Sequence, residues 1–180
     1  MMILTFVSTI LLLSCFEQNT VFFFNKMKDF QKRYPDSILK ARVGFMSPNT
    51  NNHIKSITYE EVCHASNSDF VEVLHVTLRD PHRHFEELIK FFFSFHDPTT
   101  MNRQGNDLGF QYGSYIFYQD EEQAKIAKRV RQQLREHIQN GKIKSFQRKV
   151  VTTKIIPVNI FIKAKREHQQ YLMKNPRGYW

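Results

Sequence analysis

Alternation of apolar and polar residues predicts several short β-strands along this chain. The pattern holds over residues 38–45, 69–78 and 112–118, and residues 150–162 offer one or two more strands. In residues 69–78, Glu72 shares one face with Phe70, Leu74 and Val76. Glu72 is therefore expected to point toward an apolar face.

Apolar residues three and four positions apart predict helices between these strands. One covers residues 22–34, with Met27 and Phe30 inward; a second begins at Pro81 after the capping residue Asp80; a third runs from Asp120 to Gly141. Their apolar stripes are Phe85, Leu88, Ile89 and Phe92 in the second and Ala127, Val130, Leu134 and Ile138 in the third. Residues 163–174 predict a final helix, and residues 47–57 and 96–108 predict loops. Mixed helices and strands indicate one sheet of the α/β or α+β class.

The apolar N-terminus allows several interpretations. Residues 2–15 form an apolar stretch in which a buried first strand can include residues 9–13 and end at Cys15. The same stretch has the size of a signal peptide, although no Lys or Arg precedes it, and it is too short to span a membrane as a helix. An incorrect gene start is a further alternative. We expect an N-terminal segment of residues 1–20 and a domain of residues 21–180, located in the cytoplasm, or secreted if the segment is a signal peptide.

Composition excludes several classes of protein. The net charge of +9 would suit a nucleic acid, but the basic residues are spread from Lys26 to Arg177, so we expect a solvated basic surface and no nucleic-acid partner. Cys15 and Cys63 are too few for a disulfide framework, and no paired CxxC motif indicates zinc. No spacing of ligands predicts a metal site.

Two features of the sequence indicate possible catalytic residues. A carboxylate on an apolar face should have a raised pKa, which suits a proton donor, although Glu72 could equally reach solvent at a strand edge. The loop of residues 96–107 concentrates His, Asp, Thr, Asn, Arg and Gln side chains. Such a loop either carries function or bonds to itself as a structural element, and the pattern alone leaves these alternatives open.

Residues 96–107 (HDPTTMNRQGND), with Gly109, Gln111 and Tyr112, resemble the signature loop of the A-type peptide methionine sulfoxide reductase family. The resemblance continues over residues 58–63 (TYEEVC), 69–73 (DFVEV), 168–172 (HQQYL) and 174–179 (KNPRGY). It therefore covers about residues 38–180. The family implies an α+β fold with a two-layer mixed sheet and flanking helices, in a ferredoxin-like plait.

The resemblance also implies a reaction, the thiol-dependent reduction of the S-epimer of methionine sulfoxide, free or in proteins. In the family, a Cys thiolate attacks the sulfoxide sulfur, and a Glu and two Tyr hydrogen-bond the oxygen. By matching, Glu72 is the acid, Tyr59 and Tyr112 are the oxygen ligands, and Asp107 is a polar partner. The positions matching substrate contacts are Phe16, Phe23, Phe24 and His168.

The nucleophile motif departs from the family pattern, in which a Gly-Cys-Phe-Trp-Gly run ends the first strand and opens the first helix. Alignment without gaps places Phe22 at the Cys, which removes the thiolate. A second alignment uses Cys15 and Phe16, with an insertion of about seven residues before the helix. Gly113 also stands where the family usually has Arg.

The two alignments lead to two functions. With Cys15 as nucleophile, the chain is a monomeric repair enzyme of the oxidative stress response that binds no cofactor and depends on an external thiol reductant, thioredoxin or similar. Its partners are then oxidised proteins or free methionine sulfoxide, and the thiol reductant protein. With Phe22 at the nucleophile position, the chain is an inactive family member that binds methionine sulfoxide or a protein partner.

Overall fold

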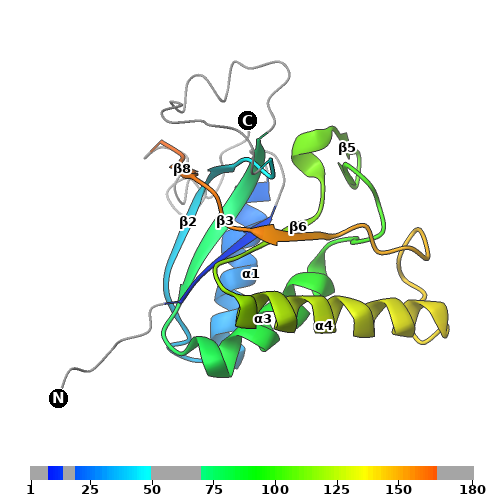
Figure 1. The fold of residues 1–180 in the computed structure, drawn as a ribbon, viewed down its shortest axis with the longest axis horizontal. Helices are drawn as coiled ribbons and strands as arrows, with labels where there is room; N and C mark the ends of the chain where they lie inside the picture. The colour runs from blue at the N-terminus through cyan, green and yellow to red at the C-terminus, as the bar shows by residue number, and fades with distance from the viewer. Residues whose placement is uncertain (1–7, 14–18, 50–69, 166–180) are drawn as a thin grey trace.

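A computed structural model describes residues 8–13, 19–49 and 70–165; for residues 8–13, 19–24 and 107, it describes the backbone alone. Figure 1 shows the arrangement of the helices and strands. In chain order they are β1 (Ser8–Leu13), α1 (Asn19–Arg33), β2 (Ile38–Met46), β3 (Val71–Leu78), α3 (Pro81–Phe95), β4 (Arg103–Gln104), β5 (Asp107–Leu108), the 3₁₀-helix η1 (Phe110–Tyr112), β6 (Tyr115–Tyr118), α4 (Glu121–Gln139), β7 (Lys154–Pro157) and β8 (Phe161–Lys163).

Six strands form one mixed sheet in the order β7-β6-β1-β3-β2-β8. Neighbouring strands are antiparallel except for β6 and β7, which are parallel. The unit β1-α1-β2-β3-α3-β6 has the strand order β6-β1-β3-β2, which is the ferredoxin-like plait, and β7 and β8 extend it at the two edges. The expected α+β fold is thus confirmed.

The helices form the second layer. α1 contacts β2, α3 contacts β3, and α4 contacts β6 and β7, while α3 also contacts α1 and α4. The predicted apolar stripes are buried in this layer, and Met27, Phe30, Phe85 and Phe92 are at most 3% exposed. Burial of these stripes in one continuous core is the main force that holds helices to sheet.

The predicted helix ends agree with the structure. The side chain of Asp80 accepts a hydrogen bond from the backbone N–H of Arg83 (3.1 Å), and Pro81 opens α3. The side chain of Asp120 accepts from the N–H of Gln123 (2.9 Å) at the start of α4. Each bond satisfies a backbone donor that the first helical turn leaves unpaired.

The strand predicted for residues 9–13 agrees with β1, which pairs with β3 on one side and β6 on the other. The boundary at residue 20 stays a prediction. The strand predicted for residues 112–118 was too long, because residues 110–112 form η1 and β6 begins at Tyr115. Lys163 belongs to β8, and most of the helix predicted for residues 163–174 lies outside the described residues.

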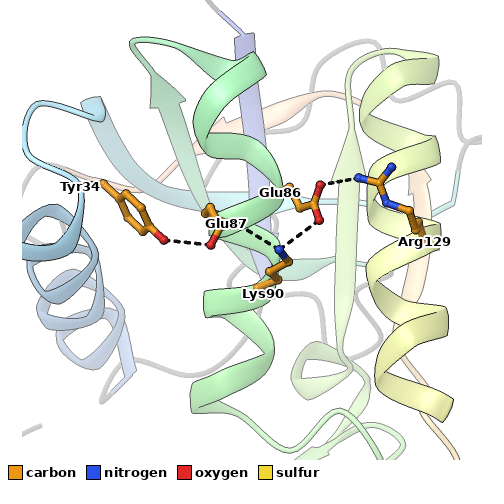
Figure 2. Close-up of polar contacts among 5 residues, drawn as sticks. All are labelled: Tyr34, Glu86, Glu87, Lys90 and Arg129. Carbon is orange, nitrogen blue, oxygen red and sulfur yellow. Dashed lines mark hydrogen bonds and ion pairs between the residues drawn. The ribbon is translucent and has the colours of Figure 1, made fainter. Parts of the chain in front are cut away.

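Ion pairs and a hydrogen bond connect the outer surfaces of the three helices (Figure 2). The hydroxyl of Tyr34 in α1 donates to Glu87 in α3 (2.9 Å), and Lys90 binds both Glu87 (3.0 Å) and Glu86 (3.1 Å). Arg129 of α4 binds Glu86 from the other side. Hydrogen bonds from Lys90 hold the pKa of both glutamates below the ordinary value.

We expect the substitution Lys90→Met to lower the free energy of unfolding by less than about 1 kcal/mol, because exposed ion pairs are screened by water and salt. Urea unfolding at low and high salt measures the effect, which should shrink as salt rises. A loss of several kcal/mol would contradict this assignment.

Among the described residues, no helix combines the length and apolar character needed to cross a membrane.

Candidate functional site

Glu72 lies in β3, an interior strand of the sheet with β1 on one side and β2 on the other. It is half-buried, opposite Phe45 of β2, and its neighbours Val71 and Val73 are at most 1% exposed. Both faces of β3 are buried, so the alternation of residues 69–78 does not separate an inner from an outer face. Glu72 is therefore partly shielded from solvent, and β3 is not an edge strand.

Tyr112, the second predicted site residue, closes η1 and is 5% exposed. Its backbone N–H donates to the carbonyl of Gly109 (3.0 Å), which tightens the turn. Gly109 has φ 151°, a conformation that L side chains rarely adopt. Because η1 contacts β3, the turn that holds Tyr112 lies against the strand that holds Glu72.

Asp107 belongs to a small hairpin that sequence reasoning treated as a loop. Its strands β4 and β5 pair Gln104 with Asp107, and Gly105 supplies the positive φ of 58° for the turn between them. The N–H of Gly109 donates to the carbonyl of Asn102 (3.0 Å) and fastens the base of the hairpin. The backbone of Asp107 is thus held three residues before the start of η1.

The side chain of Asp97 organises the loop that precedes this hairpin. One carboxylate oxygen accepts from the N–H (2.8 Å) and the hydroxyl (2.5 Å) of Thr99, and the other accepts from the N–H of Gln147 (3.0 Å). The side chain of Gln104 donates to the carbonyl of Asp97 (3.0 Å). These side chains form their hydrogen bonds within the protein. This part of the loop of residues 96–107 is therefore a structural element that bonds to itself and to residue 147.

His96 connects α3 to β6 through both ring nitrogens. Nδ1 lies 2.7 Å from the carbonyl oxygen of Phe92, so it must carry the proton and donate. Nε2 then accepts from the Ser114 hydroxyl (2.9 Å), which lies 2.8 Å from the hydroxyl of Thr153. The ring stacks on Phe92 with centroids 4.0 Å apart. Loss of solvent around the ring lowers the pKa of His96 to about 4.

This pKa predicts a loss of stability in acid. The ordinary pKa is 6.5, so between 6.5 and about 4 the unfolded chain binds a proton that folded His96 does not. The free energy of unfolding should therefore fall with falling pH, by up to about 1.4 kcal/mol per pH unit for each such histidine. His75, with its pKa also lowered to about 4, acts in the same direction.

Urea unfolding across this pH range measures the slope, and the variant His96→Gln should have a shallower one. Equal slopes in the two proteins would show that His96 is not the group responsible.

Gly113 stands where the resembled family usually has Arg, and the structure shows what surrounds this position. A Cβ placed on Gly113 would lie 2.6 Å from the ring of Tyr115 and 3.1 Å from the side-chain oxygen of Asn102. Tyr115 is 1% exposed, and its ring is therefore unable to swing into solvent. The space for a side chain at position 113 is taken by Tyr115.

We expect Gly113→Arg to lower the free energy of unfolding by about 1–3 kcal/mol, because the new side chain overpacks this region. Thermal unfolding measures the loss, and in a Tyr115→Leu background the same substitution should cost less. An equal cost in both backgrounds would contradict the role given to the Tyr115 ring.

The other predicted site residues are less fully described. Cys15, Phe16, Tyr59 and His168 lie outside the described residues, and Phe23 and Phe24 lie in α1 with only their backbone described. Among the described residues, no group of three or more His, Cys, Asp or Glu side chains could hold a metal ion.

Residues 148–152, which the sequence did not predict to take part in the site, form hydrogen bonds to the signature loop. The N–H of Arg148 donates to the hydroxyl of Thr99 (3.1 Å), and the N–H of Thr152 donates to the carbonyl of Pro98 (2.8 Å). The hydroxyl of Thr152 also donates to the carbonyl of Thr100 (3.0 Å). The adjacent threonines Thr152 and Thr153 are the one sequence signal for this role, and it is weak.

Comparison with known proteins gives consistent matches. The family profile described as "Peptide methionine sulfoxide reductase" matches residues 22–180. The protein named peptide methionine sulfoxide reductase MsrA of Methanothermobacter thermautotrophicus is 41% identical over 145 residues, which cover 81% of this chain and 79% of that protein. A probable peptide methionine sulfoxide reductase of Schizosaccharomyces pombe is 39% identical over 143 residues, covering 79% of this chain and 77% of that protein.

Solved structures agree with these matches. Reduced Mxr1 from Saccharomyces cerevisiae has a TM-score of 0.69 and 30% identity, covering 96% of this chain and 89% of its own. Methionine sulfoxide reductase A of Corynebacterium diphtheriae has a TM-score of 0.72 and 28% identity, covering 97% of this chain and 77% of its own.

Proposed function

Because this chain belongs to the peptide methionine sulfoxide reductase family, we propose that it reduces the S-epimer of methionine sulfoxide to methionine with electrons from a thiol. The observation that supports this best is the contact between β3 and η1, which brings the elements that carry Glu72 and Tyr112 together. A carboxyl group and a phenol are the groups needed to receive a sulfoxide oxygen as it gains negative charge and protons.

We assign the nucleophile to Cys15. The first strand ends at Leu13 and the first helix begins at Asn19, so Cys15 falls between them, where the family motif lies, whereas Phe22 is inside the helix. Leu13 pairs with Val73, the neighbour of Glu72. The family match begins at residue 22, so this assignment rests on the positions of β1 and α1.

The reaction then proceeds in two halves. The Cys15 thiolate attacks the sulfoxide sulfur, and the oxygen takes a proton from Glu72 while Tyr59 and Tyr112 donate hydrogen bonds to it. The oxygen is transferred to Cys15, which becomes a sulfenic acid, and methionine leaves with its sulfur reduced. An external thiol attacks the sulfenic acid and releases water, and a second thiol resolves the mixed disulfide and restores Cys15.

The other predicted site residues would contact the substrate. Asp107 would be a polar partner at the oxygen, and the substrate contacts would come from Phe16, Phe23, Phe24 and His168. We further propose that the enzyme binds no cofactor, takes electrons from a thioredoxin-like protein, acts as a monomer and repairs free or protein-bound methionine sulfoxide in the cytoplasm.

Turnover of methionine sulfoxide with dithiothreitol tests this proposal. We expect reduction of the S-epimer, no reduction of the R-epimer, and loss of activity in Cys15→Ser. Absence of turnover in protein verified as folded would overturn it, and activity that survives Cys15→Ser would overturn the assignment of the nucleophile.

A further inference from the structure

The positive charge of this chain is concentrated in residues 125–154. This segment holds ten of the 26 Lys and Arg residues and one of the 17 Asp and Glu residues, a net charge of +9. The rest of the chain has 16 basic and 16 acidic residues, which balance, so the whole net charge of +9 lies in these thirty positions. The basic residues are spread along the chain as expected, and the net charge is localised because acidic residues are nearly absent from residues 125–154.

The structure gathers this charge on one side of the molecule. α4 and the segment that follows it lie on the side of β6 and β7, away from β2 and β8 (Figure 1). We call six exposed side chains of this segment the basic face: Lys125, Lys128, Lys142, Lys144, Arg148 and Lys149. In the part of the chain that the structure describes, none of the six forms an ion pair, whereas Arg129, on the side of α4 toward α3, binds Glu86.

Two further arginines of α4 increase the positive potential beside this face. Arg131 donates to the carbonyl of Thr153 (2.9 Å) and Arg135 to that of Val151 (3.3 Å), so both are fixed. They stand four residues apart on the helix, where like charges repel. The Nε atom of Arg131 is buried and has no hydrogen-bond partner. Burial, and to a smaller extent the charge of Arg135, lower the pKa of Arg131.

One end of the basic face, at Arg148, lies against the signature loop. The segment that carries Arg148 bonds to Thr99 of the signature loop, and that loop continues through the hairpin to Asp107 and Tyr112. At the far end of the segment, Lys154 of β7 pairs in register with Tyr115, three residues after Tyr112. A partner bound at this end of the basic face would therefore lie beside the signature loop that leads to Asp107 and Tyr112.

The chemistry of this surface favours an acidic protein. Single-stranded nucleic acids bind through exposed aromatic rings between cations, and Val150 is the one exposed large hydrophobic residue in residues 125–154. A lipid surface would need a wider apolar contact. We propose that the basic face docks an acidic surface of the thiol reductant protein that regenerates Cys15. This inference rests on the proposed function and adds the surface through which the reductant is recognised.

Charge reversal tests the docking. We expect Lys142→Glu, Lys144→Glu, Arg148→Glu and Lys149→Glu combined to raise KM for an acidic thioredoxin by about tenfold or more at low salt, because complementary charge steers association. Activity with dithiothreitol should remain within about twofold, since a small neutral thiol needs no docking. The matched control reverses four exposed cations elsewhere, Lys28, Lys40, Arg83 and Lys163, and should leave KM unchanged.

Two outcomes would overturn the docking proposal: an unchanged KM in the first variant, or an equal rise of KM in both variants. Calorimetry with an acidic thioredoxin whose active-site cysteines are replaced by serine separates docking from catalysis. Binding that weakens at about 0.5 M salt and in the first variant supports the docking surface even if turnover is absent, which would refute the proposed reaction alone. Absence of such binding would overturn the docking surface.

Discussion

Replacing Glu72 by Gln should lower kcat/KM for methionine S-sulfoxide by about 10²–10⁴-fold, the range that a positioned general acid contributes. Gln keeps the shape of the side chain but has no carboxyl proton to transfer. β3 is an interior strand with buried neighbours on both sides of Glu72, so the isosteric change should leave the fold intact. Steady-state kinetics with dithiothreitol measure the loss.

The control for this variant is Glu136→Gln, which changes an exposed glutamate of α4 in the same way. Its activity should equal that of the unmodified protein. Tyr112→Phe should lower activity less than Glu72→Gln, because the phenol donates a hydrogen bond but is not the proton source. Activity of Glu72→Gln within about threefold of the unmodified protein would contradict the role of general acid.

Replacing Asp97 by Ala should lower the free energy of unfolding by about 2–4 kcal/mol. The carboxylate accepts three hydrogen bonds, two from Thr99 and one from Gln147, which lies fifty residues later in the chain. Thr99 is fully buried, so its hydroxyl and N–H would lose their partner without gaining water. The loop and the segment of residues 147–152 would separate at this point.

Urea unfolding measures this loss, and Asp29→Ala is its control, because Asp29 makes an exposed ion pair with Lys32. Asp97→Asn, which retains one acceptor oxygen, should cost less than Asp97→Ala. If Asp97→Ala were no more costly than Asp29→Ala, the bonds of Asp97 would not support the loop.

Local patterns predicted the helices and most strands because each element buries an apolar stripe of its own. The cap at Asp80, the stripe of Phe85, Leu88 and Phe92, and the end of α4 near Gly141 all follow from residues close in sequence. The strand prediction for residues 112–118 failed at residues 112–114. There the backbone bond between Tyr112 and Gly109 and the packing of Tyr115 against Gly113 decide the conformation. Alternating polarity carries no information on such contacts.

The sequence predicted the residues of the candidate site but not the bonds that support them. Alternation placed Glu72 among apolar residues, and the signature loop pointed to Tyr112 and Asp107. The support of that loop by the backbone N–H groups of Gln147 and Thr152 could not be predicted, because these bonds join residues about fifty positions apart and use a donor that nearly every residue has. The net charge of residues 125–154 can be counted from the sequence, but the sequence does not show that residues 147–152 bond to the signature loop.

A single-turnover experiment without reductant tests whether Cys15 takes the oxygen of methionine sulfoxide. Reduced protein is mixed with excess methionine S-sulfoxide, and methionine and the oxidation state of each cysteine are measured together. The proposed reaction predicts that each chain forms one methionine and one sulfenic acid, and that the sulfenic acid is at Cys15. No methionine from folded protein would contradict it and favour a binding protein, and methionine formed without oxidation of Cys15 would contradict the assigned nucleophile.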